Sequence, residues 1–374
     1  MTVRLIGRSA ARGLLAALLF ACTMPAMAMQ DLAGRELTRP AEVKRVVLGE
    51  GRLLPVLAIL EGDELTDRLV GMPRDLPLVS PGTHEAYRQR FPEIDQLPAV
   101  GRGSADTFNA EQVLALRPDL VVLSLHGHGP GAGETRLVEQ LEAAGVAVAF
   151  VDFRNEPLRH TPRSIELLGW LLDREDAAQE FVSYYQAQLD DIRTRLDTVT
   201  ERPTVFLHSR AGLSDVCCET MARGMLANLL DAAGGQNLAS NLLPGAVGTI
   251  SLELLMTRPA DLYVASGVGS QSSFERGAKY VAMGPGVSET AARTTLRKLV
   301  EEPPLSRVPT LANGKVAAIW HDFYNTPFNI VAVQVLAKWL HPAAFADVDP
   351  AQTLQTMQQR FQPVALPGTY WVML

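Results

Sequence analysis

The chain has 374 residues, of which 47% are hydrophobic, a formal net charge of −7 and three cysteines. This length allows two domains of ordinary size with a sizeable packed core. The acidic balance argues against nucleic acids and anionic membrane surfaces as partners, and three cysteines are too few for a disulfide framework.

The first 28 residues have the pattern of a secretory signal peptide. Arg4, Arg8 and Arg12 form a basic start, and residues 13–22 form an apolar run. Ala26 and Ala28 then provide the small residues of a cleavage site. The apolar run is too short for a membrane span, and no later stretch reaches the roughly 18 apolar residues that a span requires. We therefore expect an exported, soluble chain that begins at Met29; losing three Arg and no acid, it carries a net charge of −10. A lipoprotein anchored at Cys22 is the alternative, but the bulky Phe20 fits that signal poorly.

Residues 29–160 alternate short apolar strands with helical patterns, which is typical of α/β layering. Strands are expected at 45–48, 70–72, 120–123 and 146–151, and helices at 53–60 and 134–144. These elements form an N-terminal α/β lobe.

Residues 161–200 are helical and lack strand character. One helix is expected at 161–172, and a second, capped by Asp173, runs to about Leu196. The α/β pattern restarts over 201–374, with strands expected at 204–207, 262–265 and 316–319 and helices at 221–233, 328–340 and after Asp349. The sequence therefore predicts two Rossmann-like α/β lobes with central, mainly parallel sheets joined by a long helix. Two independent domains with a helical linker remain the alternative.

One segment occurs twice, at residues 109–124 and 251–266. Each copy has an N-cap residue, a Glu two positions later, a short helix, Arg-Pro and a buried strand. Each strand leads into a glycine-rich loop, at 126–129 and at 267–269. Because ligands of open α/β sheets sit outside the carboxyl ends of the strands, we expect both loops to face a shared cleft.

The repeat places Glu111 and Glu253 at equivalent positions in the two lobes. An acid in a first helical turn is stabilised by the helix dipole and needs no partner. The alternative is a functional pair, one exposed carboxylate per lobe, that docks on a symmetric receptor.

At this point the sequence resembles the periplasmic binding proteins of the ferric-siderophore, haem and cobalamin class. The resemblance covers the whole mature chain and rests on residues 91–95, 100–101, 109–124, 137–145, 234–239 and 250–253. It implies two lobes joined by a rigid helix that move little when a ligand binds. It also implies that Glu111 and Glu253 dock on arginines of an ABC permease dimer in the inner membrane.

Candidate ligand contacts follow the predicted strands of both lobes. Arginines with aromatic neighbours suit an anionic, oxygen-rich chelate, because guanidinium–carboxylate bonds hold it without competing for the metal. The candidates are Glu50, Arg52, Arg102, Ser104, His126 and His128 in the N-lobe, and His208, Arg210, Ser214, Asp215, Trp320, His321, Phe323 and Tyr324 in the C-lobe. Arg154 is expected to be an exposed, solubilising residue.

The remaining chemical signals are weaker. His126 and His128 lack third and fourth metal ligands at a characteristic spacing, and His321 and Tyr324 are not singled out as haem ligands. A nucleophile elbow, a phosphate-binding loop and a dinucleotide fingerprint are missing, so we expect no enzyme and no intrinsic cofactor. A metal-dependent hydrolase using the histidine loops is the alternative from another class.

The adjacent Cys217 and Cys218 are expected to form a disulfide in an oxidising compartment, presenting a rigid apolar turn at the cleft. Two free, partly buried thiols are the alternative.

The sequence therefore predicts a monomeric periplasmic component of an ABC importer. Its expected ligand is a ferric siderophore whose iron is carried as part of the chelate, with haem or cobalamin as the alternative.

Overall fold

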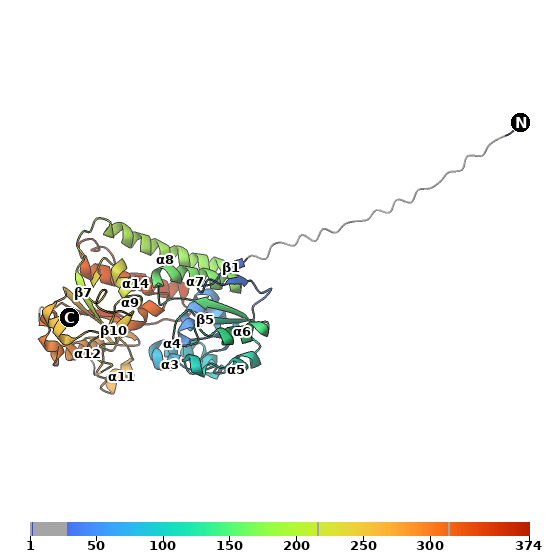
Figure 1. The fold of residues 1–374 in the computed structure, drawn as a ribbon, viewed down its shortest axis with the longest axis horizontal. Coiled ribbons are helices and arrows are strands. Elements are labelled where there is room, and N and C mark those ends of the chain that lie inside the picture. The colour runs from blue at the N-terminus through green and yellow to red at the C-terminus, as the bar shows by residue number, and fades with distance from the viewer. Residues whose placement is uncertain (1, 3–27, 215–216, 313–314) are drawn as a thin grey trace.

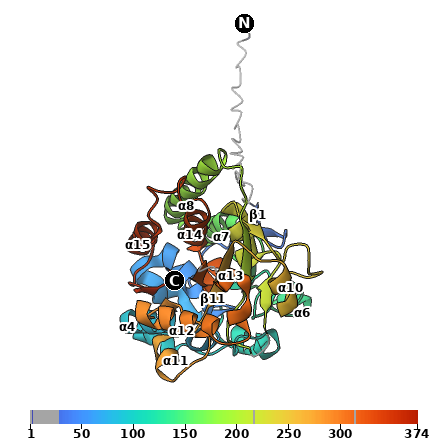
Figure 2. The ribbon, with the colours of Figure 1, turned by 90° about the vertical axis from the view of Figure 1, so that its left-hand side faces the viewer.

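The computed structural model describes residues 2, 28–214, 217–312 and 315–374. They form two lobes with separate sheets, bridged along one side by helices (Figure 1; Figure 2 gives the view from one end). Apart from residues 2 and 28, the predicted signal peptide and Cys22 lie outside the described residues. Within the described part of the chain, no helix is both long and apolar enough to cross a bilayer.

The N-lobe contains a four-stranded parallel sheet in the order β4-β3-β5-β6. Its strands are β3 (Val46–Leu48), β4 (Leu69–Gly71), β5 (Leu120–Ser124) and β6 (Ala147–Val151), which confirms the four predicted strands. Alternate residues enter two different cores: Val46 and Val122 join the large core, whereas Val47 and Val121 join a smaller one. Burial on both faces explains why these strands are continuously apolar.

Helices cover the N-lobe sheet on both faces. They are α1 (Leu54–Glu61), α2 (Leu65–Arg68), α3 (Leu76–Val79), α4 (Pro81–Arg90), α5 (Ala110–Ala115) and α6 (Thr135–Ala143). A small hairpin of β1 (Ala28–Gln30) and β2 (Glu36–Thr38) precedes them.

The C-lobe sheet has seven strands in the order β10-β8-β7-β11-β13-β15, with β9 beside β7. The strands β7, β9, β11 and β13 run parallel, and β8, β10 and β15 are antiparallel to their neighbours. Their bounds are β7 (Thr204–His208), β8 (Glu219–Met221), β9 (Gln236–Asn237), β10 (Val247–Thr249), β11 (Leu262–Gly267), β13 (Val316–Trp320) and β15 (Trp371–Met373).

The C-lobe helices surround this sheet. They are α9 (Met225–Ala232), α10 (Leu252–Thr257), α11 (Gln271–Glu275), α12 (Glu289–Glu301), α13 (Pro309–Ala312), α14 (Asn329–Leu340) and α15 (Pro350–Phe361). The helix predicted at 221–233 was wrong at its start, because residues 219–221 form β8 and Gly224, at a φ of 68°, turns the chain before α9.

Two helices connect the lobes: α7 (Pro157–Leu172) and α8 (Glu175–Leu196), which runs along both lobes in Figure 1. Asp173 adopts a left-handed conformation that ends α7, so its prediction as the cap of the next helix was wrong. The buried Tyr185 hydroxyl of α8 donates to Asn329 Oδ1 at 2.6 Å, and Asn329 Nδ2 donates to Thr161 Oγ1 at 2.8 Å. These bonds tie both connecting helices to α14 of the C-lobe.

The lobes also touch directly, on the side away from α8. Gly82 of α4 packs against Pro285 in the short strand β12 (Gly284–Pro285), where a Cβ on Gly82 would overlap the proline carbonyl oxygen. Arg52 of the N-lobe lies 3.6 Å from Asp322 of the C-lobe; the Asp322 side chain is buried and that of Arg52 is mostly covered. Helices and direct contacts together set the distance between the lobes.

Candidate functional site

A cavity of about 270 Å³ lies between the two lobes. The N-lobe contributes His128, after β5, and Arg154, after β6. The C-lobe wall consists of Ser209, Arg210, Glu219, Thr220, Met221, Met225, Val247, Gly248, Thr249, His321 and Tyr324. His128, Arg154, Ser209, Arg210, His321 and Tyr324 follow strand ends, as the topology of open α/β sheets predicts, whereas six others lie within β8 and β10.

Arg154 is the N-lobe cation of this cavity. Buried Asp152 holds its loop by accepting hydrogen bonds from the backbone N–H groups of Arg154 and Asn155, both at 3.0 Å. The guanidinium carbon lies 5.7 Å from the ring centre of Tyr324 on the opposite lobe. Its Nη1 is buried and has no hydrogen-bond partner among the described residues. Since an unpaired buried donor is costly, Arg154 favours an anionic acceptor in the cavity.

Arg210 is the C-lobe cation. Its φ of 44° turns the chain sharply after β7, and its backbone N–H donates to Ser266 Oγ at 2.8 Å. Its guanidinium pairs with Glu219 at 3.2 Å, and both side chains remain more than a third exposed. Arg210 is therefore more solvated than Arg154 and already has an acidic neighbour.

Besides the two arginines and Glu219, the wall carries the imidazoles of His128 and His321 and the phenol of Tyr324, which are neutral at neutral pH. Burial lowers the pKa of His321 well below its usual value, and the three cations Arg210, Arg52 and Arg154 lower it further. Partial burial and the same arginines lower the pKa of His128 to about 4. Burial raises the pKa of Tyr324, so its hydroxyl keeps its proton. The cavity thus combines two guanidinium groups, the carboxylate of Glu219, two neutral imidazoles and one phenol. Since Glu219 already pairs with Arg210, Arg154 is the cation of this set that suits an anionic oxygen ligand.

Two predicted ligand contacts in the N-lobe instead support the structure. Glu50 is buried, and its Oε1 accepts hydrogen bonds from the N–H groups of His128 at 3.0 Å and Gly129 at 3.3 Å. It therefore holds the histidine loop from behind. Arg52 is withdrawn into the contact between the lobes, where it faces Asp322.

Most of the other sequence candidates also lie outside the cavity wall. His208 is buried, and its Nδ1 lies 2.5 Å from the hydroxyl of Tyr263. Trp320 and Phe323 are core residues that pack edge to face. The exposed candidates outside the wall are Arg102, His126 and Ser214, and Ser104 is half-buried against Thr107; Asp215 lies outside the described residues. Of the fourteen candidates only His128, Arg210, His321 and Tyr324 meet at the cavity.

The two glycine-rich loops are not equivalent. The loop after β5 brings His128 to the cavity, but residues 267–269 after β11 do not reach it. Val268 pairs with Ala282, and Tyr280 fills the space beside Gly269.

Arg154 and the β8–β10 wall were missed by sequence reasoning. The prediction that Arg154 is an exposed, solubilising residue was wrong, because its side chain is partly buried and lines the cavity. Its position after a predicted strand, like that of His128, was the available signal. The wall gave no such signal, because β8 and β10 are three-residue strands without an alternating apolar pattern.

Glu111 and Glu253 are exposed in the first turns of α5 and α10. The predicted caps are confirmed: Asn109 Oδ1 accepts from the N–H groups of residues 111 and 112, and Ser251 Oγ accepts from the N–H group of Leu254. Within the described residues neither carboxylate forms an ion pair. Both remain available to an outside partner.

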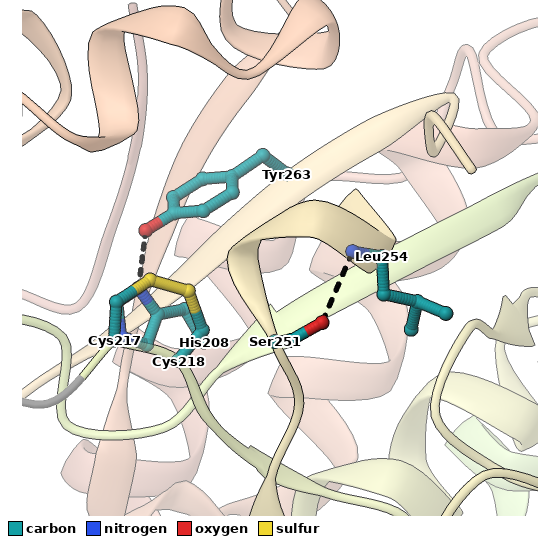
Figure 3. The surroundings of a disulfide bond; sticks show 6 residues. All are labelled: His208, Cys217, Cys218, Ser251, Leu254 and Tyr263. Carbon is teal, nitrogen blue, oxygen red and sulfur yellow. Dashed lines mark hydrogen bonds between the residues drawn. A yellow bond between two sulfur atoms is a disulfide. The ribbon is translucent and has the colours of Figure 1, made fainter. Parts of the chain in front are cut away.

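Cys217 and Cys218 are joined by a disulfide in the structure. Figure 3 draws its surroundings, which include the hydrogen-bonded His208–Tyr263 pair and Ser251 and Leu254 at the start of α10. Neither cysteine lines the cavity, so the prediction that the disulfide presents an apolar turn at the cleft was wrong. No group of three or more His, Cys, Asp or Glu side chains that could hold a metal ion occurs in the described part of the chain.

Two α/β lobes with a ligand-sized cavity between them are the architecture of a two-lobed solute-binding protein. The chain belongs to the periplasmic binding protein family, whose model matches residues 70–322. Binding proteins of this class bind small molecules and deliver them to ABC permeases.

Individual relatives bind different ligands. The chain is 26% identical over 163 residues to the ferric-anguibactin-binding protein FatB of Vibrio anguillarum, and the alignment spans 42% of this chain and 45% of FatB. The TroA-like periplasmic binding protein FepB of Veillonella parvula superposes with a TM-score of 0.81 at 22% identity, covering 93% of this chain and 99% of FepB. The molybdate-bound protein MolA of Haemophilus influenzae gives 0.67 at 17% identity, covering 91% and 99%. At these identities the two structures show the fold alone.

Proposed function

We propose that this protein is a monomeric periplasmic carrier that binds a ferric siderophore between its lobes and delivers it to an ABC permease of the inner membrane. Iron enters the cavity as part of the chelate, and the protein itself carries no cofactor. The match to FatB, which binds ferric anguibactin, supports this ligand class.

The observation that carries the proposal is Arg154, which lines the cavity and whose Nη1 has no hydrogen-bond partner among the described residues. A ferric chelate of catecholate or carboxylate arms presents anionic oxygens that this donor can bind. The tyrosine ring beside the guanidinium adds a flat surface for an aromatic arm.

The size of the cavity favours a compact chelate. At about 270 Å³ it lies near the lower limit of small-molecule pockets. A cobalamin is several times larger and would require the lobes to separate, which their direct contacts oppose.

Delivery is assigned to Glu111 and Glu253. They are equivalent by sequence, exposed and without ion-pair partners among the described residues. Carboxylates of this kind fit arginines on two equivalent permease subunits.

Tryptophan fluorescence of the purified protein tests the ligand, because Trp320 lies next to the His321 of the cavity wall. The protein is titrated with ferric complexes of catecholate, hydroxamate and carboxylate siderophores, including ferric anguibactin, and separately with haem, cobalamin and molybdate. We expect saturable quenching by at least one ferric chelate and not by its iron-free form. Saturable binding of haem, cobalamin or molybdate alone would refute the ferric-siderophore assignment. Zinc binding coupled to ester hydrolysis would favour the hydrolase instead.

A further inference from the structure

The cavity wall and the docking helix of the C-lobe are parts of one continuous segment. Strands β8 and β10 pair antiparallel, with Met221 opposite Val247, Thr220 opposite Gly248 and Glu219 opposite Thr249. All six of these residues line the cavity. The chain then passes through residues 250 and 251 directly into α10 and its carboxylate Glu253.

The disulfide stands where this wall becomes the helix. The pairing of β8 with β10 is extended by one bond, in which the N–H of Ile250 donates to the carbonyl oxygen of Cys218 at 3.2 Å. The side chain of Cys218 is fully buried, and Cys217 packs partly buried against the core. In Figure 3 the disulfide faces Ser251, the cap of α10, and Leu254 in its first turn.

A covalent ring between adjacent residues removes side-chain rotation and restricts their backbone. The carbonyl oxygen of Cys218 is therefore held in place. Ile250, whose N–H donates to that oxygen and which directly precedes the cap Ser251, is held with it. The His208–Tyr263 hydrogen bond joins the neighbouring strands β7 and β11 of the same sheet.

We propose that the Cys217–Cys218 disulfide is a positioning element that fixes α10 to the cavity wall, so that the occupied cavity is sensed at Glu253. The inference rests on the proposed docking role of Glu253. It assigns no such link to Glu111, because the residues before α5 form the short helix Ala105–Thr107, which does not line the cavity.

Hydrogen–deuterium exchange of the full mature protein tests the link without any ligand. Tris(2-carboxyethyl)phosphine reduces the disulfide to two thiols while the phosphine takes oxygen from water to become its oxide. We expect the amides of residues 250–257 to exchange about tenfold faster after reduction. The carbonyl of Cys218 is then no longer held by the disulfide, so this segment can open locally at a lower free energy. Residues 109–115, the matching copy in the other lobe, serve as the internal control and are expected to keep their rate.

A variant separates positioning from general stabilisation. Cys217→Ser with Cys218→Ser should exchange like the reduced protein and should not respond to the phosphine. Removal of the phosphine and oxidation with ferricyanide should restore slow exchange in the wild type only. Unchanged exchange at 250–257 in a protein shown by mass spectrometry to carry two thiols would overturn the proposal, and so would equal acceleration at 109–115.

The second arm adds ferric anguibactin as the probe. Slower exchange at 250–257 is expected with the disulfide intact and is lost in the serine variant. If the probe binds and leaves 250–257 unchanged in the oxidised protein, the link to the cavity is refuted. If no fluorescence response to any ferric chelate occurs, the ligand assignment fails, and the ligand-free experiment still decides whether the disulfide positions α10.

Discussion

The two copies of the internal repeat have the same local structure and different connections to the cavity. Asn109 and Ser251 both cap a six-residue helix that carries an exposed Glu and leads to a buried strand. In the N-lobe the cavity residue His128 comes after the copy, beyond its strand. In the C-lobe the cavity residues 247–249 come before the copy, next to its cap. Equal sequence units therefore give two equivalent exposed carboxylates, whereas the route from each carboxylate to the cavity depends on the chain around it.

The docking glutamates give the largest expected effect. Glu111→Ala combined with Glu253→Ala should abolish uptake of the iron-labelled chelate by cells, because losing a charge-pair partner costs about 2–5 kcal/mol per site. Ligand affinity, measured by fluorescence titration of the purified variant, should stay within about twofold of the wild type, since neither side chain lines the cavity.

Glu139→Ala is the matched control, because Glu139 is an exposed acid of α6. It should leave uptake unchanged. Retained uptake in the double variant, or loss of ligand binding in it, would contradict the assignment of the two carboxylates.

The two arginines of the cavity, Arg154 of the N-lobe and Arg210 of the C-lobe, differ in burial and in whether they already have an acidic partner. Arg154→Met should weaken ligand binding by roughly 10- to 100-fold, because a buried charge-assisted hydrogen bond contributes about 1.5–3 kcal/mol. Arg210→Met should cost about threefold or less, since this exposed side chain already pairs with Glu219. Fluorescence titration measures both, and exposed Arg136, exchanged for Met, is the control. Equal losses for the two arginines would show that the ligand does not distinguish the lobes.

The lobes should also respond to pH in opposite directions. Burial raises the pKa of Asp75 in the N-lobe to about 6, so the folded state keeps a proton that the unfolded chain releases above its usual value of 3.8. Asp75 therefore lowers stability as pH rises from about 4 to 6. Burial lowers the pKa of His208 in the C-lobe to about 4, so the unfolded chain gains a proton first and stability falls as pH drops from 6.5 to about 4.

Thermal unfolding of single variants measures these effects. Asp75→Asn keeps an acceptor for the N–H of Gly51 and should raise the free energy of unfolding by about 1–3 kcal/mol at pH 7.5, with little change at pH 4. The free energy of unfolding of His208→Gln, relative to that of the wild type, should be higher at pH 4.5 than at pH 7.5. A pH-independent difference for either variant would show that its proton equilibrium is not coupled to folding.

The caps give the smallest expected effect. Asn109→Ala and Ser251→Ala should each destabilise their helix by about 1 kcal/mol, measured as local hydrogen exchange. The loss should be larger at α5, because Asn109 accepts two backbone N–H groups and Ser251 accepts one. A larger loss at α10 would mean that the neighbouring disulfide does not support that helix.

The fold was largely predictable because its main strands are buried on both faces and therefore appear as short apolar runs. Helix spacing over residues 161–196 likewise revealed α7 and α8. The edge of the C-lobe sheet was not predictable: β8 and β10 gain their stability from pairing with each other, and their residues have mixed polarity.

The cavity was predictable only in part for a related reason. Strand-end positions correctly indicated His128, Arg210, His321 and Tyr324 as wall residues. The same rule cannot distinguish a side chain that enters the cavity from one that hydrogen-bonds to the backbone of a neighbouring loop, as Glu50 does. The direction of the side chain depends on how the loops pack against each other, which a strand-end position does not reveal. Arg154 shows the converse, since only its buried donor distinguishes it from a surface arginine.

The contact between Gly82 and Pro285 also determines what can be built from this scaffold. Since no side chain fits between the two backbones, each added carbon at position 82 would act as a spacer between the lobes. Alanine, serine and valine at position 82 would provide a series of variants with increasing distance between the two lobes. Such a series would allow the carrier to be matched to chelates of increasing size and developed as a set of optical iron sensors.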